Sequence, residues 1–111
     1  MKDLAFASNR VWLHRQFRKS IESPMHRYWI EFDITGYAAP PMEAMMGFGV
    51  TSHTQDDALA LLQQYIFRER ELPPLRGVIE DVDVSTLDPR HVRPNMGNPV
   101  WPGIWFPLGF Q

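Results

Sequence analysis

The alternation of side-chain types over residues 27–37, RYWIEFDITGY, constrains the fold more than any other feature of this chain. Large apolar side chains occupy every second position of the segment, at Tyr28, Ile30, Phe32 and Ile34. Side chains that follow each other along a β-strand point to opposite faces of the sheet, so this period of two predicts a half-buried strand. The fold therefore has to contain a sheet that gives this strand a partner.

A second strand is predicted over residues 45–52, MMGFGVTS, after a proline pair that ends the first one. Three apolar residues share one face of it: Met46, Phe48 and Val50. Gly47 and Gly49 occupy the other face, which indicates a bulge or the close approach of another backbone segment or a ring. We interpret residues 27–51 as a hairpin with a long loop.

Residues 52–70, SHTQDDALALLQQYIFRER, predict an amphipathic helix that packs on the sheet. Its buried stripe has the helical spacing of three and four residues: Ala58, Leu61, Leu62, Tyr65 and Ile66. Either Thr54 with Asp57 or Ser52 with Gln55 can cap the first turn. The helix ends before the proline pair that follows, because a residue that precedes proline disfavours the helical conformation.

The next segment, residues 77–87, GVIEDVDVSTL, predicts a third strand. Its dense negative charge is typical of a strand near the edge of a sheet, where charged side chains oppose pairing with other molecules.

The end of the chain, residues 98–110, alternates again, but each of its three prolines lacks a backbone donor. This tail must run along a sheet edge or across a face, after a turn at Pro94 folds it back on the domain. One face of the tail would complete the core, and the other would expose or half cover Trp101 and Trp105. The alternative is that both indole rings belong to the core of a small domain.

The N-terminal residues 9–24, NRVWLHRQFRKSIESP, favour a basic amphipathic helix, with a strand over residues 6–14 as the competing interpretation. Together the segments predict a single α+β domain over residues 1–111. Its parts are a small antiparallel sheet, one central amphipathic helix packed on it, an N-terminal helix and an extended tail rich in aromatic residues and proline.

Charge is divided unevenly along the chain. The 111 residues carry a net charge of -2, yet residues 31–88 hold eleven acids and three bases, whereas residues 1–30 hold six bases and two acids. The small net charge argues against a general binder of nucleic acids or anionic membranes, and no apolar run is long enough to span a bilayer. The absence of cysteine excludes disulfides and thiolate chemistry and fits a cytoplasmic location.

No catalytic or metal-binding pattern stands out. His53 with Asp56 and Asp57 lacks the spacing of a zinc site, and the chain has no nucleophile elbow or phosphate-binding loop. The acids of the third strand suggest a magnesium site only at first sight, because neighbouring positions of a strand direct their carboxylates to opposite faces. We therefore expect no cofactor, no metal and no enzymatic activity.

The predicted hairpin, the helix that opens with TQDDALALL and the acidic strand VIEDVDV resemble the small immunity proteins of bacterial toxin-immunity pairs, including those of contact-dependent growth inhibition. The resemblance covers roughly residues 27–88. It implies a monomer or homodimer that neutralises a basic toxin domain by direct binding. From the charge and the aromatic tail we predict five contact residues: Glu80, Asp81, Asp83, Trp101 and Trp105.

Two alternatives remain open. A cleft between the tail and the sheet could hold a small ligand, or serve a small enzyme with His91 or His53 as acid or base. The bases of residues 10–27 interleave with aromatic side chains, which suggests a nucleic-acid accessory protein as a third function.

Overall fold

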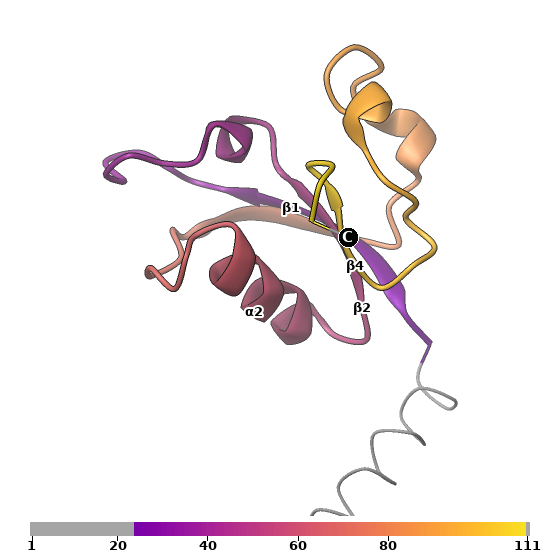
Figure 1. Cartoon of the computed structure of the whole chain (residues 1–111), viewed down its shortest axis with the longest axis horizontal. Helices are drawn as coiled ribbons and strands as arrows, with labels where there is room; N and C mark the ends of the chain where they lie inside the picture. The colour runs from indigo at the N-terminus through magenta and orange to yellow at the C-terminus, as the bar shows by residue number, and fades with distance from the viewer. Residues whose placement is uncertain (1–23, 111) are drawn as a thin grey trace, which may run out of the picture.

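The computed structural model describes residues 24–110, which are built around a four-stranded antiparallel sheet (Figure 1). The strands are β1 (His26–Phe32), β2 (Phe48–Ser52), β3 (Leu75–Glu80) and β4 (Gly103–Phe106), in the spatial order β3-β1-β2-β4. The helices are α2 (Gln55–Tyr65) and the short 3-10 helices η1 (Met42–Met45), η2 (Val84–Thr86) and η3 (Arg93–Asn95). This is the predicted small α+β domain; the predicted N-terminal helix lies outside the described residues.

The hairpin of β1 and β2 confirms the pairing expected from the two alternating segments. Tyr28 lies opposite Val50 and Ile30 lies opposite Phe48 in an antiparallel register. Their side chains form the main core with α2, which covers this face of the sheet (Figure 1). Burial of these large apolar side chains is the main stabilising contribution that a domain of this size has available.

The second face of β1 is covered as well, which corrects the prediction of a half-buried strand. Trp29 points away from α2 and is nevertheless buried, because residues 82–96 cross that face. Three apolar residues of this irregular segment pack in a second cluster with Trp29: Val82, Leu87 and Val92. The central strand is therefore enclosed between α2 and a layer that has little regular structure.

The two glycines at the start of β2 each face an indole ring, as the sequence indicated. A Cβ atom at Gly47 would lie 2.7 Å from the ring of Trp29, and one at Gly49 would lie 2.4 Å from the ring of Trp105. Real Cβ atoms do not approach other atoms so closely. Only glycine leaves the space that these two rings fill.

Helix α2 begins after the predicted cap at Thr54, but it ends at Tyr65, five residues before the end of the predicted segment. The Thr54 side chain accepts a hydrogen bond of 3.0 Å from the backbone N–H of Asp57, so Thr54 is the cap and Ser52 is not. Ala58, Leu62 and Ile66 are buried as predicted. Tyr65 is 47% exposed, which contradicts its place in the predicted stripe, although its neighbours Ile66 and Phe67 are buried in the main core.

The two edge strands of the sheet are β3 and β4, as expected, but β3 is shorter than the predicted third strand. β3 forms one edge, but it ends at Glu80, and residues 84–86 form η2 instead of continuing the strand. β4 forms the other edge, as the prolines of the tail required. The predicted turn also folds the tail back, because the N–H of Gly97 donates to the carbonyl oxygen of Trp105 at 2.6 Å. Among the described residues, no helix is long and apolar enough to cross a membrane.

Candidate protein-binding surface

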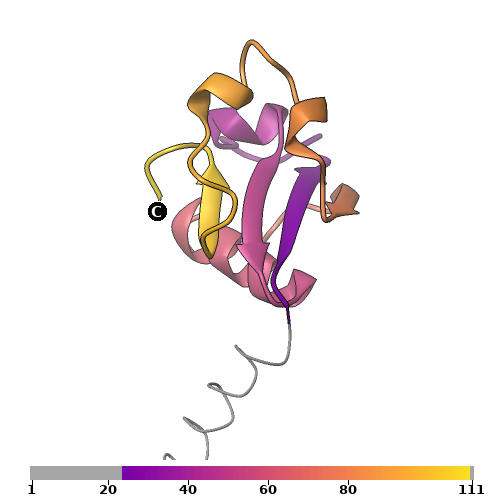
Figure 2. The same ribbon diagram turned by 90° about the vertical axis from the view of Figure 1, so that its right-hand side faces the viewer.

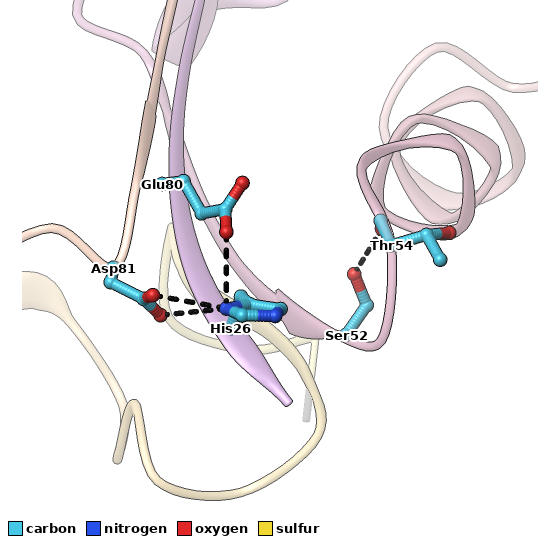
Figure 3. A network of polar contacts seen from close by, with 5 residues as sticks. All are labelled: His26, Ser52, Thr54, Glu80 and Asp81. Carbon is cyan, nitrogen blue, oxygen red and sulfur yellow. Dashed lines mark hydrogen bonds and ion pairs between the residues drawn. The ribbon is translucent and has the colours of Figure 1, made fainter. Parts of the chain in front are cut away.

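Two of the predicted contact residues, Glu80 and Asp81, lie at the end of β3 and both contact His26, the first residue of β1 (Figure 3). The Nδ1 atom of His26 lies 3.0 and 3.1 Å from the two carboxylate oxygens of Asp81 and 3.3 Å from a carboxylate oxygen of Glu80. Carboxylates only accept hydrogen bonds, so this contact requires a proton on Nδ1. The side chains of Glu80 and Asp81 remain 58% and 54% exposed, which leaves their charge available at the surface.

The convergence of Glu80 and Asp81 corrects the expectation that neighbouring acids of this segment point to opposite faces. β3 ends at Glu80, and Asp81 has a left-handed backbone with a φ of 56°. The next N–H group, of Val82, donates to the carbonyl oxygen of Arg27 at 3.0 Å, and the Val82 side chain enters the second cluster. The alternation of the strand has therefore stopped, and both carboxylates can face His26.

Asp83 has a different local role from the other two acids. Its carboxylate accepts hydrogen bonds from the hydroxyl group and the backbone N–H of Ser85, at 2.7 and 3.0 Å, and so caps η2. These bonds lower the pKa of Asp83, and the hydrogen bond from His26 similarly lowers the pKa of Asp81. Both side chains consequently stay ionised over a wider range of acidic pH than free aspartate does.

The two tryptophans of the tail lie in opposite environments, and the structure corrects the prediction for one of them. Trp101 is 67% exposed, whereas Trp105 is fully buried. Trp105 packs on Gly49 and its indole N–H donates to the hydroxyl oxygen of Thr51 at 3.1 Å. Ile104 and Phe106, on either side of Trp105, are buried too, so the tail has no exposed face at β4. The register between β2 and β4 shifts next to Gly49, where Trp105 packs. Trp105 is therefore not a surface contact.

The loop that carries Trp101 is held by local hydrogen bonds. The Thr51 hydroxyl group donates to the carbonyl oxygen of Pro99 at 2.6 Å. The side chain and the carbonyl group of Asn98 accept from the N–H groups of Val100 and Trp101, at 2.9 and 3.3 Å. An exposed ring on a loop that is already fixed by hydrogen bonds loses little conformational freedom when it binds a partner.

The sheet register places Trp101 at the same end of the molecule as the acidic cluster. His26 lies opposite Ser52 and Thr51 lies opposite Gly103, so the first residues of β1 and β4 and the last residues of β2 share one end (Figure 2). The last residue of β3 lies at the same end, because Glu80 is opposite Tyr28. Adjacent strands are about 4.8 Å apart, so β3 and β4 are separated by about 14 Å at this end. We call Glu80, Asp81, Asp83 and Trp101 the acidic sheet end.

His26 belongs to this surface although no sequence pattern predicted a role for it. It meets Asp81, which is 55 residues away in the sequence, only because β1 and β3 pair. Nothing in the residues next to His26 indicates this contact. The only available signal was its place at the start of a strongly alternating strand.

A separate apolar groove lies at the opposite end of the sheet. Its volume is about 520 Å³, and it is lined by η1 and by the residues that follow β4, with Met42, Met45, Met46, Pro107 and Leu108 among them. His91 also lines the groove, and its Nδ1 atom lies 3.3 Å from a carboxylate oxygen of Asp88. His53, the other histidine considered as an acid or base, is not part of the lining.

Comparisons with known proteins add no relative to these observations: the chain matches no family model, no curated protein and no solved structure.

Proposed function

We propose that this protein is a non-enzymatic protein-binding module whose acidic sheet end binds a basic protein partner. The observation that carries the proposal is that the sheet register places Trp101 at the same end of the molecule as Glu80 and Asp81. An exposed tryptophan and charged groups at the same end of a molecule, within the span of one interface, have the composition of a binding hot spot and its charged surroundings.

The electrostatic part of the proposal concerns association. Residues 24–110 carry eleven acids and six bases, and the acidic sheet end gathers three of the acids. A surface of one sign accelerates the encounter with a partner of the opposite sign and orients it before contact. Glu80 and Asp81 are exposed enough to act in this way.

The aromatic part concerns the lifetime of the complex. Trp101 is exposed and held in place by its loop, and tryptophan is among the residues that contribute most when an interface buries them. A ring that the partner covers would slow dissociation more than association.

In its most concrete form, the proposal is that the module is an immunity protein. The resemblance of the hairpin, helix and acidic strand to immunity proteins supports this function, and a basic toxin domain has the charge that the acidic sheet end would bind. We place this action in the cytoplasm, where the cysteine-free sequence would be at no disadvantage.

The first experiment identifies the partner and then tests the charge. The tagged protein is used to capture its partner from native cells at moderate ionic strength, and association is measured by surface plasmon resonance over a range of salt concentrations. The variant with Glu80→Gln, Asp81→Asn and Asp83→Asn should associate more slowly and with a weaker salt dependence, because it lacks the steering charge.

A matched control removes three acids from the opposite end of the domain: Glu43→Gln, Glu69→Gln and Glu71→Gln. These residues lie in η1 and in the segment between α2 and β3. The control changes the net charge by the same amount but leaves the acidic sheet end intact. It should therefore retain most of the steered association. If both triple variants lose the same amount, the net charge and not the acidic sheet end is responsible.

The apolar groove supports a second candidate function, the binding of a small apolar ligand. Its volume of about 520 Å³ is in the range of small-molecule sites, and methionine side chains adapt to varied shapes. Chemical-shift mapping with a library of small apolar compounds tests this function. Shifts confined to residues 42–46 and 106–108 would support it, and the absence of any such shifts would rule it out for that library.

A further inference from the structure

His26, Glu80 and Asp81 form a group that has the composition of a metal site and that the proposed function does not require. Each residue offers one ligand atom, and these atoms all lie within 4.8 Å of one another. We propose that this group binds a divalent cation of the first transition series, of the Zn²⁺ type. This inference does not rest on the protein-binding function proposed above, although both involve Glu80 and Asp81.

Two of the three distances within the group are close to those of a tetrahedral site, and the carboxylate oxygens of Glu80 and Asp81 lie within 4.8 Å of each other. Zn²⁺ binds imidazole nitrogen and carboxylate oxygen at about 2.0 to 2.2 Å, so two ligand atoms of a tetrahedron are about 3.4 Å apart. The Nδ1 atom of His26 lies 3.0 Å from Asp81 Oδ2 and 3.3 Å from Glu80 Oε2. The cation can replace the proton of Nδ1 with small movements of exposed side chains, and a water molecule would complete the coordination.

The imidazole determines which cations fit. Mg²⁺ and Ca²⁺ prefer oxygen ligands, whereas a nitrogen donor beside carboxylates suits Zn²⁺ and its neighbours in the transition series. The histidine also separates this group from a simple accumulation of surface acids, because its nitrogen faces both carboxylates at once (Figure 3).

The sheet holds the three ligands in register before any cation binds. Tyr28 lies opposite Glu80 in the pairing of β1 and β3, and the N–H of Val82 donates to the carbonyl oxygen of Arg27 just beyond it. A bound cation would link the start of β1 to the residue that follows β3. It would also reduce the negative charge of Glu80 and Asp81 by coordination.

The test is isothermal titration of the full chain with ZnCl₂, and in parallel with MgCl₂. We expect saturable binding of one Zn²⁺ and no saturable binding of Mg²⁺. His26→Ala should weaken Zn²⁺ binding by at least about tenfold, since even the loss of a group that only supports a ligand costs that much. Asp81→Asn, which keeps the size of the side chain, should also weaken Zn²⁺ binding.

His91 provides the matched control, because it contacts a single carboxylate at 3.3 Å, that of Asp88. His91→Ala and His14→Ala should leave Zn²⁺ binding unchanged, and circular dichroism confirms that each variant is folded. The appearance of a Zn²⁺-dependent shift of the His26 ring signals in NMR spectra would locate the cation independently. The proposal is overturned if Zn²⁺ fails to bind at millimolar concentration, if His26→Ala and Asp81→Asn bind it normally, or if Mg²⁺ competes equally.

Discussion

Gly47 and Gly49 leave space for the indole rings of Trp29 and Trp105. Both rings belong to the second cluster, on the face of the sheet opposite α2. The rings also contact each other, with their centroids 6.2 Å apart. Both indole N–H groups are bonded, to Glu31 and to Thr51. The sequence predicted either a bulge at these glycines or the close approach of a ring or a backbone segment, and the register with β4 does shift between Gly49 and Val50. It could not identify the rings, because Trp105 and Gly49 meet only after β2 and β4 have paired.

Gly49→Ala should destabilise the domain by about 1 to 3 kcal/mol, because the new methyl group would overlap the buried ring of Trp105. Urea denaturation followed by circular dichroism measures the change. Gly77→Ala is the control: nothing lies within 4 Å of a Cβ atom there, so its free energy of unfolding should change by less than about 1 kcal/mol. Equal effects of the two variants would show that the ring contact is unimportant.

The contact between His26 and Asp81 makes stability depend on pH in one direction. The hydrogen bond from His26 lowers the pKa of Asp81 below its ordinary value of 3.8. A carboxyl group with a lowered pKa in the folded state stabilises the fold above its ordinary pKa, and this contribution is lost as the pH falls through the lowered value.

The difference in free energy of unfolding between the wild type and Asp81→Asn should therefore shrink as the solution is acidified below about pH 5. Urea titrations at a series of pH values measure this difference. A difference that grows on acidification below that pH would contradict the assigned contact.

At the scale of the elements, local signals predicted the hairpin and α2, while the ends of the strands depended on tertiary contacts. The alternation around Ile30 and the cap at Thr54 are properties of neighbouring residues, so they could be read from the sequence. The end of β3 at Glu80 could not be read in this way, since valines continue beyond it. There Val82 leaves the strand and fills the second cluster, which brings Glu80 and Asp81 together.

Thr54→Ala should destabilise the domain by about 1 kcal/mol, because the backbone N–H of Asp57 would lose its bond to the capping hydroxyl group. Thr54→Ser retains that hydroxyl group and should recover most of the loss. Thermal unfolding at neutral pH compares the three proteins, and a Thr54→Ser variant as unstable as Thr54→Ala would exclude capping as the cause.

For the whole molecule, α2 covers one side of the sheet and the irregular residues 82–96 cover the other. The tail joins the two clusters, since Ile104 belongs to the main core and Trp105 and Phe106 belong to the second. Periodicity could not predict the irregular layer, which is made of turns and short 3-10 helices. It also could not assign one tryptophan of the tail to the core and the other to the surface.

Trp105→Ala should cost about 3 to 5 kcal/mol of stability, as is typical when a fully buried tryptophan is removed. Trp101→Ala should change stability by no more than about 0.5 kcal/mol, because its side chain is largely exposed. The same exposed variant should dissociate faster from a captured partner. A Trp101→Ala protein with unchanged dissociation would remove Trp101 from the binding surface while leaving the fold assignment intact.

The unequal environments of these tryptophans also give the molecule a built-in optical label. Trp29 and Trp105 are enclosed, so collisional quenchers dissolved in the solvent should have little access to them, whereas Trp101 should be quenched readily. With Trp12 replaced by phenylalanine, the quenchable fraction of the emission would come mainly from Trp101. Shielding of that fraction on addition of a candidate partner would report coverage of the acidic sheet end without any attached dye.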